Sequence, residues 1–144
     1  MPKTILVLNG PNLNMLGQRE PGIYGAKTLA DIEADCRTEA ERLGYAIDFR
    51  QSNLEGELIT WIQQAPDNAV GLIINPAGYG HTSIAMHDSL RLLSMPIVEV
   101  HLSNIHAREE FRHKTMVAPV ATGMICGFGP IGYVLAIQAL AARL

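Results

Sequence analysis

The sequence is poor in cysteine and in basic charge, and each shortage excludes a class of protein. Its two cysteines, Cys36 and Cys126, lie far apart and form no C-x-x-C pair, which fits neither a disulfide framework nor a zinc site. We therefore expect a reducing, cytoplasmic location. The net charge of -3 provides no basic stripe of the kind that binds nucleic acid.

Long apolar runs are also missing. The N-terminus leads from MPKT into ILVL, which is shorter than the ~7 to 15 residues of a signal-peptide core, and no stretch approaches the ~18 apolar residues of a membrane helix. The sequence thus predicts a soluble protein that does not associate with membranes. With 144 residues, 48% of them hydrophobic, it is long enough for one domain (1–144) with a full core.

What the sequence does contain is an alternation of short apolar runs with longer amphipathic segments. Strands are expected at TILVLN (4–9), YAIDFRQ (45–51), AVGLIIN (69–75), PIVEVHLS (96–103) and ATGMICG (121–127). Helices are expected from a capping box at Thr28 to Gly44, from an Asn53 cap to Pro66, from a Ser83 cap through Leu93, and from Pro130 onward. This order favours an α/β fold, a flavodoxin-like open five-stranded parallel sheet in the order 2-1-3-4-5 with helices on both faces.

Long polar loops follow three of the expected strands. They read NGPNLNMLGQREPGIYG (9–25), NPAGYGHTS (75–83) and HLSNIHAREEFR (101–112). Each is longer than a connection from strand to helix requires. Open parallel sheets bind ligands at the carboxyl ends of their strands, so we expect a functional site where these loops meet.

Two charged or polar side chains interrupt the fourth expected strand. Glu99 and His101 alternate with apolar residues and therefore share one face of the strand. In a central strand covered by helices, an unpaired carboxylate or imidazole would be costly to desolvate. We expect Glu99 to accept a hydrogen bond from His101, directly or through water, and so to orient the ring. A plain scaffold domain leaves this pair unexplained.

The three polar loops resemble those of the type II 3-dehydroquinate dehydratases. The shared motifs are N-G-P-N-L-N-x-L-G-x-R-x-P-x-x-Y-G at 9–25, N-x-x-x-x-x-H-T-S at 75–83 and E-V-H-L-S-N-x-x-x-R-E-x-F-R at 99–112. The resemblance implies an enzyme that converts 3-dehydroquinate to 3-dehydroshikimate through an enolate, without a cofactor, in a homododecamer built from trimers. It leaves open whether the enzyme serves aromatic biosynthesis or quinate breakdown.

The resemblance also implies catalytic roles. Such a dehydration needs a base, a group that holds the enolate and an acid for the departing hydroxyl. Tyr24 would be the base, favoured as a phenolate by Arg19, and His101 would be the acid. We expect Arg108 to be a second cation beside Tyr24, because the loop after the fourth strand must return over the same strand ends. Asn12 would hold the water that hydrogen-bonds the enolate oxygen. The glycines and the proline around Tyr24 suit a lid that closes over substrate.

Substrate contacts follow from the same resemblance. Asn75, His81 and Arg112 would bind the ring hydroxyls, and Asp88 would reach across from a neighbouring subunit. The backbone N–H groups of Leu102 and Ser103, with the Ser103 hydroxyl, are suitable donors for the substrate carboxylate. No metal is expected, since the other histidines show neither the spacing nor the placement of a metal cluster.

One loop departs from the family pattern. The family commonly reads Asn-Pro-Gly-Ala-Tyr-Thr-His where residues 75–81 read Asn-Pro-Ala-Gly-Tyr-Gly-His. Because glycine accepts backbone angles that alanine resists, we expect the path from Asn75 to His81 to differ and both substrate contacts to shift.

Three other functions compete with this interpretation. GFGPIG (127–132) matches the dinucleotide-binding fingerprint, but only twelve residues follow it, so we expect a tight turn instead. A flavin carrier would need a phosphate cradle after the first strand, where Asn, Leu, Arg and Tyr stand. A receiver module would need a lysine among clustered acids at the strand ends, and the lysines are badly placed.

Taken singly, the candidate residues also have ordinary structural explanations. Asn12 alone is more often a turn residue and Tyr24 alone a packing residue, and only their joint pattern favours catalysis.

Overall fold

The computed structural model describes residues 1–18 and 26–144. The expected base Tyr24 and its partner Arg19 lie outside the described residues. The five strands are β1 (Thr4–Asn9), β2 (Ala46–Gln51), β3 (Gly71–Asn75), β4 (Ile97–His101) and β5 (Gly123–Cys126). They form one sheet in the order β2-β1-β3-β4-β5, and each neighbouring pair is parallel. The predicted flavodoxin-like topology is therefore confirmed, and each strand begins and ends within two residues of its predicted position.

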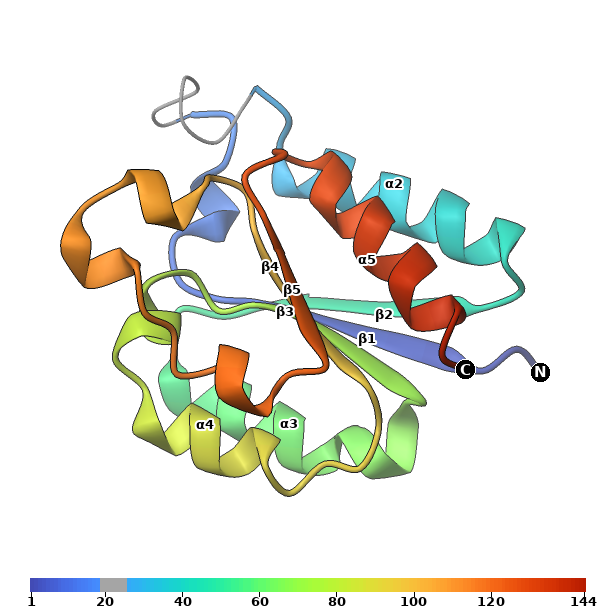
Figure 1. Cartoon of the computed structure of the whole chain (residues 1–144). Coiled ribbons are helices and arrows are strands. Elements are labelled where there is room, and N and C mark those ends of the chain that lie inside the picture. Colours follow the sequence, from blue (N-terminus) through green and yellow to red (C-terminus); the bar gives the residue numbers. More distant parts are fainter. Residues whose placement is uncertain (19–25) are drawn as a thin grey trace.

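Helices cover both faces of the sheet. They are α2 (Leu29–Arg42), α3 (Glu55–Asn68), α4 (Ile84–Leu90) and α5 (Ile131–Ala141). Short 3-10 turns lie at η1 (Leu13–Met15), η2 (Ala77–His81), η3 (Ile105–Ala107), η4 (Glu110–Arg112) and η5 (Ala118–Val120). Figure 1 shows α2 and α5 on one face and α3 and α4 on the other. Within the described ranges, no helix is long and apolar enough to cross a membrane.

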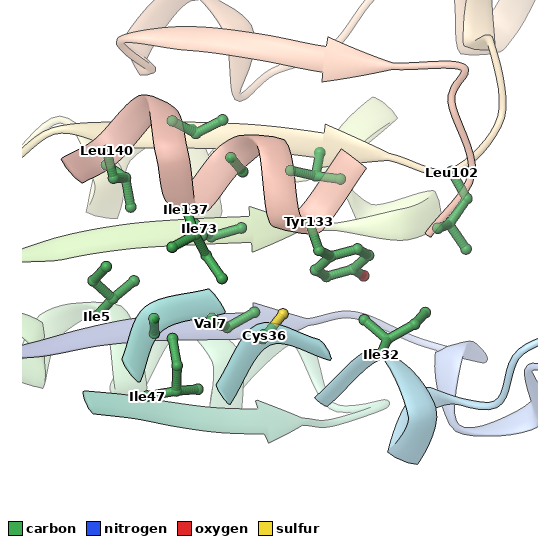
Figure 2. Packing of buried hydrophobic residues seen from close by; sticks show 14 of the residues in the cluster. Ile5, Val7, Ile32, Cys36, Ile47, Ile73, Leu102, Tyr133, Ile137 and Leu140 are labelled. Atoms are coloured by element: carbon green, nitrogen blue, oxygen red, sulfur yellow. The ribbon is translucent and has the colours of Figure 1, made fainter. Parts of the chain in front are cut away.

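The core divides into two layers because strand side chains alternate between the faces. Ile5, Val7 and Ile73 pack beneath α2 and α5, together with Tyr133 and Ile137 (Figure 2). The intervening strand residues pack against α3 and α4. By this alternation Asn9 and Asn75, at the ends of β1 and β3, face α5, whereas Glu99 and His101 face α3 and α4. The polar residues at the strand ends thus fall on opposite sides of the sheet.

Two predicted helix caps are confirmed. Thr28 and Asp31 form a reciprocal capping box at the start of α2. At the start of α4, the Ser83 hydroxyl accepts a hydrogen bond from the Met86 N–H. These caps satisfy N–H groups that would otherwise lack a partner in the first turn.

Two other helix predictions are wrong. The N-cap of α3 is Leu54, and the Asn53 side chain instead accepts a hydrogen bond from the Asn12 backbone N–H, at 2.9 Å. The same helix continues through Pro66, which lies in its last turn, where the Ala69 N–H still bonds the helix at 2.9 Å.

The predicted end of the third helix, the one capped by Ser83, also differs. α4 ends at Leu90 instead of Leu93, because the chain tightens there into turns in which Leu92 and Leu93 bond three residues back.

Candidate active site

A pocket opens at the carboxyl ends of the central strands. Its lining includes predicted site residues from all three polar loops, namely Asn12, Asn75, His81, His101, Leu102, Ser103, Arg108 and Arg112. Apolar side chains of the η1 and η3 turns, among them Leu13 and Ile105, complete the wall. The structure therefore gathers residues from Asn12 to Arg112, which are 100 positions apart in the sequence, around one concave surface.

Glu99 and His101 are in direct contact at the base of this pocket. His101 Nε2 lies 2.5 Å from Glu99 Oε2. His101 is 5% exposed and lines the pocket, whereas Glu99 is completely buried behind it. A carboxylate in this position accepts the ring N–H at Nε2 and leaves Nδ1 for a ligand. The buried Glu99 thus fixes the orientation of the His101 imidazole at the pocket.

Thr115, which the sequence analysis did not single out, holds the second oxygen of this carboxylate. Its hydroxyl donates to Glu99 Oε1 at 3.0 Å and accepts from the Ala118 backbone N–H at 2.8 Å. Because the hydroxyl oxygen already accepts from a backbone donor, its single proton is directed at Glu99. Both carboxylate oxygens are therefore partnered, as burial of the group requires.

The His81 ring stacks on the ring of His101. The His81 and His101 rings lie 5.8 Å apart between centroids and are inclined by 27°. His81 Nδ1 donates to the Lys114 carbonyl at 2.9 Å, since a carbonyl can only accept. Burial lowers the pKa of His81, and the neighbouring His101 and Arg112 lower it further, whereas the hydrogen bond to Lys114 and the Glu99 carboxylate oppose this shift. The ring is thereby kept neutral, with Nε2 available as an acceptor.

The loop at 75–81, which differs from the family pattern, keeps both expected substrate contacts, Asn75 and His81, at the pocket. Ala77 adopts a left-handed conformation, with φ 52°, of the kind that glycine accepts most readily. At Gly80, an added Cβ would lie 2.6 Å from the Pro76 ring, so a side chain there requires a shift of the loop. Asn75 and His81 nonetheless both line the pocket, so the expected change in the loop does not remove them from it.

A cationic wall forms next to the end of β4. Arg108 Nη1 donates to the Ser103 hydroxyl at 3.3 Å, and Arg112 Nε donates to Glu109 Oε1 at 3.1 Å. The two arginine side chains are only 17% and 24% exposed. A partly desolvated guanidinium group beside the Ser103 hydroxyl, with a second one in the same pocket lining, suits an anionic ligand.

The remaining candidates lie at or beyond the rim. Asn12 has a left-handed backbone, with φ 69°, and is held by its N–H bond to Asn53. Asp88 is exposed on α4 and is not among the described residues that line the pocket. In the described ranges, no three His, Cys, Asp or Glu side chains are grouped so that they could hold a metal ion.

Comparison with known proteins identifies what the chain as a whole resembles. The sequence model of the family described as Dehydroquinase class II matches residues 3–141. A 3-dehydroquinate dehydratase from Chelativorans sp. (strain BNC1) is 68% identical, with 100% of each chain covered. The type II dehydroquinase of Propionibacterium acnes has a TM-score of 0.94 at 48% identity, covering 99% of this chain and 98% of the other. That of Butyrivibrio crossotus has the same TM-score at 42% identity, covering 96% and 97%.

Proposed function

The chain belongs to the class II dehydroquinases, and we propose that it removes water from 3-dehydroquinate to give 3-dehydroshikimate, a step of the shikimate pathway. The observation that carries the proposal is the buried Glu99–His101 pair, which presents a ring nitrogen to the pocket. Family membership is supported by a match over nearly the whole chain. An acid held in this way is what a departing hydroxyl requires.

The reaction begins at the carbon next to the ketone. Tyr24, as a phenolate supported by Arg19 and Arg108, takes a proton from this carbon and leaves an enolate. A water held by Asn12 stabilises the enolate oxygen by hydrogen bonding. The places of Arg108 and of the exposed Asn12 in the lining of the same pocket support these roles.

The second step expels the hydroxyl. As the enolate returns to a ketone, the C–O bond on the next carbon breaks, and His101 Nδ1 supplies the proton that converts the leaving hydroxyl to water. Glu99 stabilises the protonated ring through Nε2, at 2.5 Å. One proton is removed and one is returned, so the step needs no oxidant, reductant or cofactor.

Substrate binding uses the rest of the pocket. Asn75, His81 and Arg112 contact the ring hydroxyls, and the donors at Leu102 and Ser103 bind the carboxylate. The neutral His81 ring, with Nε2 unoccupied by Lys114, supports a role as acceptor for a hydroxyl. The nearby guanidinium groups offset the negative charge of the substrate.

We also propose that the enzyme works in the cytoplasm as a homododecamer built from trimers, in which Asp88 completes the site of a neighbouring subunit. The support is that Asp88 is exposed and lies apart from the described lining of its own pocket. This position supports a contact with substrate bound to another chain.

The proposed function is tested by mixing the purified protein with 3-dehydroquinate. Loss of water places a carbon–carbon double bond in conjugation with a carbonyl, and the product therefore absorbs ultraviolet light that the substrate does not. We expect this absorbance to rise with the protein and not with buffer alone. No rise at substrate concentrations in the millimolar range would overturn the proposal.

A further inference from the structure

Tyr133 carries a buried polar group that the proposed reaction does not use. The residue belongs to the first turn of α5 and is completely buried in the core between that helix and the sheet (Figure 2). Burial raises the pKa of its phenol, so the hydroxyl keeps its proton. A buried hydroxyl of this kind needs partners, and the partners of Tyr133 lie at the strand ends below the pocket.

The Tyr133 hydroxyl belongs to a series of four hydrogen bonds that all run in one direction. The Ala77 backbone N–H donates to Asn75 Oδ1 at 3.1 Å, and Asn75 Nδ2 donates to the Tyr133 oxygen at 2.9 Å. The Tyr133 hydroxyl donates to Asn9 Oδ1 at 2.7 Å, and Asn9 Nδ2 donates to the Arg50 carbonyl at 2.9 Å. The series begins at a backbone donor and ends at a backbone acceptor, and neither of these can reverse its role.

The fixed direction leaves one orientation for the Asn75 amide. If the amide were flipped, its Nδ2 would face the Ala77 N–H and two donors would oppose each other. In the observed orientation, Asn75 is 3% exposed and lines the pocket, with one N–H of its amide not used by Tyr133. We propose that Tyr133 is a positioning residue that, together with the Ala77 N–H, holds the Asn75 amide in the direction in which it offers its N–H to a ring hydroxyl of the substrate, an inference that rests on the proposed function.

The glycines before Tyr133 allow the chain to turn so that its hydroxyl lies beneath the pocket. Gly127 and Gly129 have φ of 98° and 71°, which allows the sharp turn from β5 into α5. An added Cβ at Gly132 would lie 3.5 Å from a Val100 methyl group, so this first turn of the helix already lies close against β4. The motif that resembles a dinucleotide fingerprint therefore serves to bring the Tyr133 hydroxyl beneath the pocket.

The test compares Tyr133→Phe with the wild type on 3-dehydroquinate. Phenylalanine keeps the ring in the core and removes only the hydroxyl, so Asn75 Nδ2 loses its acceptor and the amide is held by the Ala77 N–H alone. We expect KM to rise by about 5- to 20-fold, the loss of roughly one hydrogen bond, while kcat changes by less than about 3-fold. The matched control is Ile137→Val, which disturbs the same helix in the same core and should leave KM unchanged.

A second readout does not depend on turnover. In a crystal structure of Tyr133→Phe, we expect the Asn75 side chain to be rotated or present in two orientations, and Asn9→Ala should have the same effect because the hydroxyl then loses its acceptor. An unchanged KM, or an Asn75 side chain that keeps its position in Tyr133→Phe, would overturn the inference. A wild-type protein that does not turn over 3-dehydroquinate would instead overturn the proposed function and leave the crystallographic test in place.

Discussion

The imidazole of His101 and the carboxylate of Glu99 lie two residues apart on one face of β4, and His101 Nε2 is 2.5 Å from Glu99 Oε2. The other oxygen of this carboxylate accepts a hydrogen bond from Thr115, which lies between η4 and η5. Glu99, which orients His101, is therefore itself held in place by Thr115. A change at Thr115, which contacts His101 only through Glu99, should affect the acid step.

Thr115→Val is expected to lower kcat about 10-fold with little change in KM, because Glu99 loses a donor without any change in the substrate contacts. Thr115→Ser keeps the hydroxyl and should restore most of the activity. Thr122→Val is the matched control, since Thr122 also accepts from a backbone N–H, at 3.0 Å, but at the opposite end of β4. Steady-state kinetics of the three variants checks the expectation, and equal losses in Thr115→Val and Thr122→Val would contradict it.

The regular elements were predictable because their signals are local. β-branched and apolar runs indicated the strands, and the period of two placed Glu99 and His101 on one face, where the structure brings them into contact. Thr115 and Tyr133 could not be found in this way, because their partners lie in other elements, 124 residues away for Tyr133 and Asn9. Asn53 was misread for a related reason, since its side chain bonds a loop instead of its own helix.

Acid should destabilise the folded protein partly through His81. Burial lowers its pKa below the ordinary 6.5, so the folded chain binds this proton less readily than the unfolded chain. The contribution of His81 to stability is therefore present above pH 6.5 and is lost as the pH falls through the lowered pKa. His81→Asn keeps a donor near Lys114 but cannot titrate, and it should lose less stability between pH 7.5 and 5.0 in urea unfolding. An identical loss in both proteins would count against this.

Cys36 should be inert in the native protein. Burial raises the pKa of its thiol to about 12, so almost no thiolate is present at pH 8. We expect iodoacetamide to leave Cys36 unmodified in the folded protein and to modify it after unfolding in urea, as measured by peptide mass spectrometry. Rapid labelling of Cys36 in the native state would show that its site opens far more readily than its complete burial indicates.

Sharing of the site between subunits can be tested by complementation. Asp88→Ala and His101→Ala chains should each be nearly inactive alone. Mixed assemblies should recover some activity. In some of their sites, the Asp88→Ala chain supplies an intact His101 and the neighbouring His101→Ala chain supplies an intact Asp88. Mixing is verified by mass spectrometry of differently tagged chains. Mixed assemblies that remain inactive would mean that both residues serve the same chain, or that Asp88 has no part in the reaction.

The central claim, that His101 is the acid of the dehydration, is tested most directly by the kcat of His101→Ala on 3-dehydroquinate. Loss of a general acid should lower kcat by ~10² to 10⁴, and KM should change far less because the group acts mainly in the transition state. A kcat within a few-fold of the wild-type value, in a variant with an intact fold, would contradict the account.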